Sequence, residues 1–256
     1  SPSVWAWRQS RIPKIARQVD LLLCVFPFEP ALYKGTGLRC EFIGHPLTTQ
    51  ISFNPDPVVS AEALNLPVNG LILGMLPGSR ESEVKRLLPL FLAVFDRLVA
   101  EDKDLVGVIP AATGNLYELI QSMVGLRPMR VVHGKSQAVI AASKAVLVAS
   151  GTAALESVLT GRPTVAAYKM NPWTYRLVKS KVKTEFVTLP NFLANHGLIP
   201  ELIQEKASVE SIVDAILPML KESPANQFLT EAQKIYDLLT GDVSGRAAEV
   251  ILEQLS

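Results

Sequence analysis

Residues 71–100 read LILGMLPGSRESEVKRLLPLFLAVFDRLVA, and this stretch decides the fold. It opens with a continuous apolar run, passes through a turn that contains Pro77 and Gly78, and then repeats apolar side chains at helical spacing. An apolar run without polar alternation is typical of a strand that is buried on both faces of a parallel sheet. Residues 71–76 are therefore predicted to form a buried strand, and residues 83–100 an amphipathic helix.

The same succession of apolar run and helical pattern continues on both sides of this stretch. Further buried strands are predicted at residues 20–26, 105–109, 129–132, 145–149 and 164–167. Helices are predicted between them at residues 60–64, 115–124, 136–142 and 152–159. Strands that alternate with helices predict an α/β fold, a Rossmann-like doubly wound parallel sheet with right-handed crossovers.

Pro and Gly residues cluster between residues 44 and 57, which indicates a linker and a domain boundary near residue 50. Residues 1–50 hold too few elements for a domain, and we interpret them as the C-terminal part of an N-terminal Rossmann-like domain plus the linker. Residues 51–207 are predicted to form a complete Rossmann-like domain. Residues 208–256 are predicted to be C-terminal helices, at residues 208–220, 226–239 and 245–255, with Ser208 as the N-cap of the first.

The composition narrows the classes of function. The 256 residues carry 25 Lys and Arg against 24 Asp and Glu, a net charge of +1, so nothing supports bulk binding to nucleic acid. Mean hydropathy is +0.26, yet no uncharged apolar run reaches the roughly 18–20 residues that a membrane span needs. Cys24 and Cys40 form neither a CxxC nor a zinc pattern, and we interpret them as buried or free thiols in a reducing compartment.

The turn after the strand at residues 71–76 is the first candidate site. In a parallel sheet this turn lies at the carboxyl ends of the strands, where ligands bind. Gly78 would let the backbone approach an anion, Ser79 could cap the following helix, and Arg80 would add a cation suited to a diphosphate. The alternative is an ordinary capped helix with a solvated Arg.

The turn after the strand at residues 145–149 repeats this layout. Ser150, Gly151 and Thr152 offer backbone N–H groups and two hydroxyls, which suit a phosphate. Glu156 follows Thr152 by one helical turn and could accept both hydroxyls of a ribose. The alternative is a helix cap followed by a Glu that the helix dipole favours.

Together the two turns predict a site for a nucleoside diphosphate at neighbouring strand ends. Neither turn is a GxGxxG or a Walker motif, so neither NAD nor P-loop ATP is indicated. Neither turn supplies a carboxylate cluster suited to a metal, so we expect no metal and no cofactor. Helix dipoles and Arg80 would then have to neutralise the diphosphate.

Other residues are weaker candidates for a cleft. Trp5, Trp7 and Arg8 could line a pocket, or the two tryptophans could pack in a core or interface. Asn191, expected in a loop, could hydrogen-bond a sugar or could serve a turn.

Two histidines complete the set of candidates. His45, within the linker, could act as a base or could pack in a hinge. His133 lies at a predicted strand end near the proposed nucleotide, although no partner pattern accompanies it.

Taken in order, these stretches resemble the lipid-A-disaccharide synthase family of B-fold (GT-B) glycosyltransferases. The resemblance lies in SPSVWAWRQ at 1–9, PFE at 27–29, FIGHPL at 42–47, LPGSR at 76–80, ASGTAALE at 149–156 and TLPNFLA at 188–194. It covers nearly the whole chain, and the ordered set of motifs is more specific than any one of them.

The resemblance implies a reaction and its location. Two Rossmann-like domains would form the cleft, and residues 51–207 would bind the UDP-sugar donor. The family transfers 2,3-diacylglucosamine from UDP-2,3-diacylglucosamine to 2,3-diacylglucosamine 1-phosphate with inversion, giving the β-1,6-linked lipid A disaccharide and UDP. A metal-free bacterial enzyme, cytoplasmic and peripheral on the inner membrane, is implied, and a homodimer is compatible with it.

The resemblance also implies roles for particular residues. Arg80 and the turn at 150–152 would hold the diphosphate, and Glu156 would bind the ribose. Asn191 would lie near the sugar–diphosphate, and the backbone near His133 would read the uracil. Trp5, Trp7 and Arg8 would then sit on the N-terminal side of the cleft.

Family chains begin well upstream of SPSVWAWR, with a Gly-rich strand and turn and an Asp proposed as the general base. This sequence lacks those features, so we interpret it as the C-terminal two thirds of such an enzyme, with the base in the part that is missing. Two alternatives stay open: a UDP-sugar epimerase of the same architecture, which would need a carboxylate and a His in the cleft, and a non-catalytic UDP-binding fragment.

Overall fold

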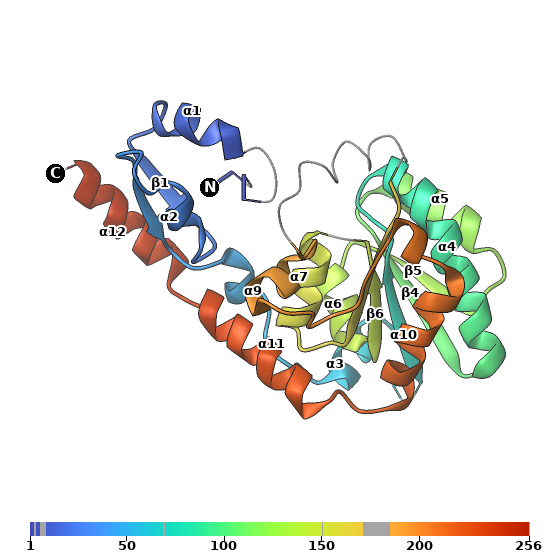
Figure 1. Ribbon diagram of the computed structural model, residues 1–256. Coiled ribbons are helices and arrows are strands. Elements are labelled where there is room, and N and C mark those ends of the chain that lie inside the picture. Colours follow the sequence, from blue (N-terminus) through green and yellow to red (C-terminus); the bar gives the residue numbers. More distant parts are fainter. Residues whose placement is uncertain (3, 6–8, 69, 150, 171–184, 256) are drawn as a thin grey trace.

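A computed structural model describes the chain except for residues 3, 6–8, 69, 150, 171–184 and 256, and it contains two parallel sheets (Figure 1). The smaller sheet pairs β1 (Leu21–Cys24) with β2 (Arg39–Phe42). Short helices accompany it: η1 (Gln9–Arg11), α1 (Ile12–Ala16) and α2 (Glu29–Leu32). The strand predicted at residues 20–26 is shorter than expected, because the Glu29 carboxylate accepts hydrogen bonds from the N–H groups of Val25 and Phe26 and turns the chain there.

The larger sheet has six parallel strands in the order β5-β4-β3-β6-β7-β8. They are β3 (Leu71–Leu76), β4 (Leu105–Ala111), β5 (Met129–His133), β6 (Ala145–Val148), β7 (Thr164–Tyr168) and β8 (Glu201–Ile203). The predicted α/β fold with a doubly wound sheet is confirmed, and the strand order reverses between β3 and β6, as it does in dinucleotide-binding folds. The sequence did not predict β8, whose three residues are all only partly buried.

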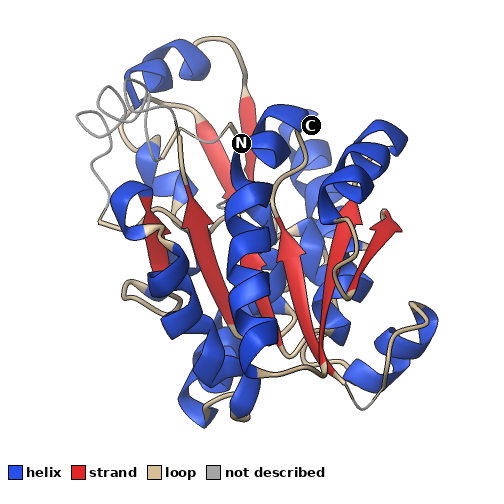
Figure 2. Ribbon diagram, turned by 90° about the vertical axis from the view of Figure 1, so that its right-hand side faces the viewer, coloured by secondary structure: helices blue, strands red, loops and turns tan. Residues whose placement is uncertain are grey.

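Helices cover both faces of the larger sheet (Figure 2). Side chains of α4 (Glu81–Glu101), α5 (Gly114–Val124) and α10 (Val209–Lys221) share one core with alternate strand residues such as Leu147. On the other face lie α3 (Pro57–Ala63), α6 (Ser136–Ala142), α7 (Thr152–Leu159), α9 (Leu189–Ala194) and α11 (Asn226–Leu239). Val146 and Val148 point to this second face. Both faces are apolar, which accounts for the uninterrupted apolar runs of the sequence.

The C-terminal helices go to three different places. Ser208 is the N-cap of α10, as predicted, because its hydroxyl accepts a hydrogen bond from the N–H of Ser211 at 3.1 Å. Helix α10 packs on α4, and α11 packs on α7 and α9. Helix α12 (Val243–Leu255) leaves the larger sheet and lies beside β1 (Figure 1). Residues 208–256 therefore connect the two sheets and do not form one layer.

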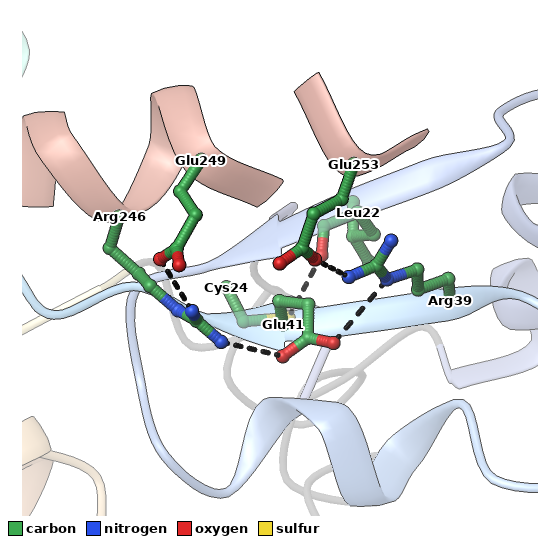
Figure 3. Close-up of polar contacts among 7 residues, drawn as sticks. All are labelled: Leu22, Cys24, Arg39, Glu41, Arg246, Glu249 and Glu253. Atoms are coloured by element: carbon green, nitrogen blue, oxygen red, sulfur yellow. Dashed lines mark hydrogen bonds and ion pairs between the residues drawn. The ribbon is translucent and has the colours of Figure 1, made fainter. Parts of the chain in front are cut away.

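An ion-pair network fastens α12 to β2 (Figure 3). Arg39 on β2 pairs with both Glu253 of α12 and Glu41, and Arg246 of α12 pairs with Glu249 and lies 3.8 Å from Glu41. Nearby, the Sγ of the buried Cys24 lies 3.8 Å from the carbonyl oxygen of Leu22. Val250 of α12 is fully buried, so apolar packing holds this helix in addition to the exposed and half-exposed ion pairs.

The two parts of the chain also meet in the predicted linker, which contains η2 (Pro46–Thr49). The N–H of His45 donates to the carbonyl oxygen of Leu239 at the end of α11. Gly44 has a φ of 88°, and a Cβ there would lie 3.2 Å from Cγ2 of Val243. The backbone at Gly44 therefore lies close to the segment that joins α11 to α12. None of the helices in the described part of the chain is both long and apolar enough to cross a membrane.

Candidate functional site

The two predicted turns lie side by side at one edge of the larger sheet. Strand β3 pairs directly with β6, with Leu76 opposite Val148, and the N–H of Ala149 donates to the carbonyl oxygen of Leu76 at 2.9 Å. The turns 77–80 and 149–152 therefore leave the sheet from adjacent carboxyl ends, at the point where the strand order reverses. The expectation that the two turns share one edge is confirmed.

The turn after β6 presents an open helix end. Ser150 lies outside the described residues. Gly151 is the N-cap of α7 and has a φ of 117°, and among the described residues no side chain caps the helix. A Cβ built at Gly151 would meet nothing within 4 Å, and Thr152 is exposed. Within the described part of the chain nothing caps this end of α7, and the positive end of the helix dipole there favours an anion.

The turn after β3 is arranged differently from the expectation. Helix α4 has Arg80 at its N-cap position, and Ser79 does not cap it. Instead the carboxylate of Glu83 reaches back, accepting the N–H of Ser79 at 3.2 Å and the guanidinium of Arg80 at 3.1 Å. The predicted cap is therefore wrong, because the helix begins one residue later, with Arg80 at the N-cap position, and Ser79 only donates its N–H to the Glu83 carboxylate.

Gly78 is required in this turn by a protein contact. Its φ is 131°, and a Cβ there would lie 2.6 Å from the Cβ of Glu83. The expected approach of backbone to an anion is thus replaced, in this structure, by the approach of Glu83. The side chain of Arg80 remains 77% exposed, so its guanidinium can reach an anion bound at the same edge.

Glu156 is a partly buried carboxylate on α7. Among the residues that the structure describes, its side chain accepts no hydrogen bond and pairs with no cation. Burial raises its pKa above the usual value of 4.5, because no positive charge offsets the loss of solvent. A free carboxylate one turn along α7 is the geometry that the ribose prediction needs, and that role stays a prediction.

Asn191 does not lie in a loop, so that expectation is corrected. It is buried in helix α9, and its Nδ2 donates to the carbonyl oxygen of Ile199 and to Oε1 of Glu201, both at 2.9 Å. Its Oδ1 accepts the N–H of Ile199 at 2.9 Å. Both amide hydrogens are used within the protein, so none is free for a sugar.

His45 has no nitrogen lone pair to offer as a base. Its Nδ1 accepts the N–H of Leu47 at 3.2 Å, so a neutral ring carries its proton on Nε2. Burial lowers its pKa below the usual value, and its ring packs 5.0 Å from that of Phe26. The structure therefore agrees with the interpretation that His45 packs in the hinge, and not with a role as a base.

His133 ends β5 and is exposed, with its ring 6.2 Å from that of Tyr117. Side chains of this strand line an open pocket of about 390 Å³ at the edge of the sheet, with Arg130 and Lys135 as its cations. The predicted role of the backbone near His133, recognition of the uracil, stays a prediction.

Trp5 belongs to an aromatic cluster between the two sheets, while Trp7 and Arg8 lie outside the described residues. Its ring centroid is 5.8 Å from Phe28, which follows β1, and 4.7 Å from Phe192 on α9. Phe28 also stacks on Phe26 at 5.4 Å. Motifs that lie far apart in the sequence, SPSVW, PFE, GHP and LPNF, therefore converge on one junction.

Several residues of this region were not singled out from the sequence. Glu29, Glu83 and Glu201 each accept hydrogen bonds from backbone N–H groups at a turn or helix end. Their positions in the sequence do not predict these contacts, since the tertiary structure decides which N–H groups each carboxylate meets. In the described part of the chain, no group of three or more His, Cys, Asp or Glu side chains is placed to hold a metal ion.

Comparison with known proteins gives consistent matches. A family model described as lipid-A-disaccharide synthetase matches residues 1–254. The lipid-A-disaccharide synthase of Pseudomonas paraeruginosa is 41% identical over 256 residues, covering 99% of this chain and 67% of that protein. That of Cellvibrio japonicus is 43% identical over 259 residues, covering 98% and 66%. The chain thus spans about two thirds of the length of these relatives.

Solved structures with low sequence identity share the fold. UDP-GlcNAc 2-epimerase from Neisseria meningitidis bound to UDP-GlcNAc has a TM-score of 0.62 at 11% identity, covering 93% of this chain and 62% of that one. The calicheamicin glycosyltransferase CalG4 has a TM-score of 0.58 at 15% identity, covering 92% and 54%. The described chain therefore has the architecture seen in GT-B glycosyltransferases.

Proposed function

The chain belongs to the lipid-A-disaccharide synthase family of glycosyltransferases, and we propose that it binds a UDP-sugar donor at the β3–β6 edge of its larger sheet. The observation that carries this proposal is the meeting of the turns 77–80 and 149–152 at adjacent strand ends. In open α/β sheets, ligands bind where the strand order reverses, outside the carboxyl ends of the strands. Residues 51–207 would then form the donor-binding domain.

The open amino end of α7 is proposed to hold the diphosphate. The space in front of Gly151 has room for phosphate oxygens, and the exposed Thr152 adds a hydroxyl to the free N–H groups. Arg80 would supply the positive charge from the neighbouring turn, exchanging part of its contact with Glu83 for the phosphate. Ser150 would belong to the same cradle.

Glu156 and His133 are proposed to bind the nucleoside. The carboxylate of Glu156 would accept the two ribose hydroxyls, for which it must be ionised. The backbone near His133, two strands from β3, would read the edge of the uracil. With these proposed roles, the base, the ribose and the diphosphate would lie along one edge of the larger sheet.

The proposed reaction transfers 2,3-diacylglucosamine from UDP-2,3-diacylglucosamine to 2,3-diacylglucosamine 1-phosphate. The 6-hydroxyl oxygen of the acceptor attacks the anomeric carbon of the donor, the bond from that carbon to the diphosphate oxygen breaks, and a general base takes the hydroxyl proton. Inversion gives the β-1,6 linkage. The α7 dipole and Arg80 would stabilise the negative charge that develops on the departing UDP.

The general base is proposed to come from the part of the family's sequence that precedes residue 1 of this chain. His45 is unsuited, because Nδ1 already accepts a hydrogen bond from the N–H of Leu47. Since both proposed substrates carry acyl chains, the reaction would take place at a membrane surface, and we propose the cytoplasmic surface of the inner membrane. A homodimer is compatible with the proposal.

The proposal is tested with the chain joined to the N-terminal part of a family member, because that part is proposed to supply the general base. UDP-2,3-diacylglucosamine and 2,3-diacylglucosamine 1-phosphate are mixed with it, UDP release is followed with time, and the disaccharide phosphate is identified by mass spectrometry. Release of UDP together with the disaccharide is expected. Binding of UDP by calorimetry without turnover would instead favour a UDP-binding unit, and conversion of UDP-GlcNAc to its C2 epimer would favour an epimerase.

A further inference from the structure

Glu201, the first residue of β8, accepts hydrogen bonds from the segment that leads into α9. Its Oε1 accepts the N–H of Thr188 at 2.8 Å, the hydroxyl of Thr188 at 2.7 Å and Nδ2 of Asn191 at 2.9 Å. Its Oε2 accepts the N–H of Val187 at 3.0 Å. These donors account for about all the acceptor sites that a carboxylate offers.

The helix held in this way lies between the proposed donor site and the N-terminal part of the chain. Helix α9 packs against α7, whose amino end is the proposed diphosphate site. From its other side Phe192 meets the rings of Trp5 and Phe28, both at a centroid distance of 4.7 Å. The position of α9 therefore sets how these two regions stand relative to one another.

We propose that Glu201 is a positioning residue for the glycosyl transfer, holding α9 between α7 and the aromatic cluster of Trp5, Phe28 and Phe192. This inference rests on the proposed function, since transfer needs the donor aligned with groups on the N-terminal side of the cleft. A misplacement of about 1 Å can cost on the order of 100-fold in rate. UDP alone needs only the strand-end turns and should bind without this alignment.

A carboxylate is required because every group around it is a donor. In Glu201→Gln the side chain keeps one acceptor oxygen and gains two N–H donors. One end of the amide then faces either the N–H of Val187 or the donors from Thr188 and Asn191 without an acceptor. The variant removes hydrogen bonds at nearly constant size, and it leaves Phe192 itself in place.

The test compares turnover with UDP binding. In the protein joined to the N-terminal part of a family member, Glu201→Gln should lower kcat for UDP release about 10- to 100-fold, with the Kd for UDP from calorimetry within about twofold of wild type. The matched control is Glu205→Gln, which makes the same change of charge at an exposed residue of η3 (Gln204–Lys206) and should keep wild-type kcat. Equal losses of kcat and UDP affinity in Glu201→Gln would contradict the proposal.

A second variant tests whether Glu201 acts through α9. Phe192→Leu removes the ring contacts and should lower kcat in the same way. The double variant should then lose little more than either single variant, since both act on the same alignment. Effects on kcat that multiply would show that Glu201 acts by another route.

Hydrogen exchange separates failure of this inference from failure of the proposed function. Glu201→Gln should speed exchange in residues 187–194 and leave residues 152–159 of α7 protected. A wild-type joined protein that binds UDP but releases none from the donor contradicts the proposed function, and unchanged exchange in residues 187–194 overturns the role of Glu201 whatever the turnover.

Discussion

The ring of Trp5 lies 4.7 Å from the ring of Phe192, centroid to centroid, with an interplanar angle of 40°. One residue precedes the first strand of the small sheet, and the other belongs to α9 on the face of the large sheet. Aromatic pairs at this separation add about 0.5–1.5 kcal/mol beyond the area they bury. The contact thus joins the two parts of the chain independently of the ion pairs of α12.

Arg80→Ala should weaken UDP binding by about 10- to 150-fold, because a hydrogen bond to a charged group contributes about 1.5–3 kcal/mol. Uridine, which lacks the diphosphate, should bind both proteins alike. Calorimetry with both ligands measures this. The control is Lys85→Ala, which removes an exposed cation of the same helix that pairs with Glu81. Equal binding of UDP by wild type and Arg80→Ala would remove Arg80 from the site.

Glu156→Ala should weaken UDP and leave pyrophosphate binding close to wild type. The reason is that the carboxylate is proposed to accept ribose hydroxyls, which pyrophosphate lacks. Competition between each ligand and a fluorescent UDP analogue gives both affinities. If the substitution weakens pyrophosphate as much as UDP, Glu156 acts on the phosphates and the ribose assignment is wrong.

Glu156 also makes a prediction about pH and stability. Its pKa in the folded chain is raised by burial above its usual 4.5, so between these two values the folded state binds more protons than the unfolded state. Protonation of Glu156 thus favours folding, and this contribution is lost as pH rises through the folded-state pKa. Glu156→Gln should therefore have a higher Tm than wild type at pH 7, and the gain should vanish near pH 4. A Tm gain that does not depend on pH would contradict this.

The sequence predicts the larger sheet well because its signal is local. Each buried strand is a continuous apolar run, and residues 152–159 form a helix with the predicted bounds. Strand β8 escaped prediction because Glu201–Ile203 is short and only partly buried. Its place is set by pairing with β7, which no local pattern encodes.

The candidate site was predicted only in part, for the same reason. The adjacency of the turns after β3 and β6 follows from strand order in a doubly wound sheet, which the alternation of elements implies. Asn191 was expected in a loop, since Asn and Pro favour turns. The hydrogen bonds that hold it in α9 come from Ile199 and Glu201, and only the folded chain brings them there.

Val250→Ala should destabilise the chain more than Arg39→Ala. Val250 is fully buried on α12, and losing two carbons together with the cavity costs about 2 kcal/mol. Arg39 lies at the surface with a side chain that is 34% exposed, and solvent screens ion pairs of this kind so that they contribute little to stability. Urea unfolding at low and high salt measures both. Added salt should shrink the effect of Arg39→Ala and leave that of Val250→Ala unchanged. A larger loss for Arg39→Ala would mean that the ion pairs dominate the attachment of α12.

Asn191→Ala tests whether Asn191 supports the fold or contacts the ligand. The substitution leaves both the buried N–H and the carbonyl oxygen of Ile199 without a partner. An unsatisfied buried polar group costs about 1–3 kcal/mol, so the loss of two partners should lower the free energy of unfolding by about 2–6 kcal/mol. Urea unfolding measures it, with Asn115→Ala at an exposed position of α5 as the control, expected within about 0.5 kcal/mol of wild type.

Asn191→Asp sharpens the same test. The aspartate would place a second carboxylate against Glu201 and would lose both donors, so the loss of stability should be at least as large as for Asn191→Ala. A sugar contact predicts the opposite pattern, with near-normal unfolding and weaker binding of UDP-2,3-diacylglucosamine relative to UDP. Because both of its amide hydrogens are already donated within the protein, we expect the loss to appear in stability and the ratio of the two affinities to stay near that of the wild type.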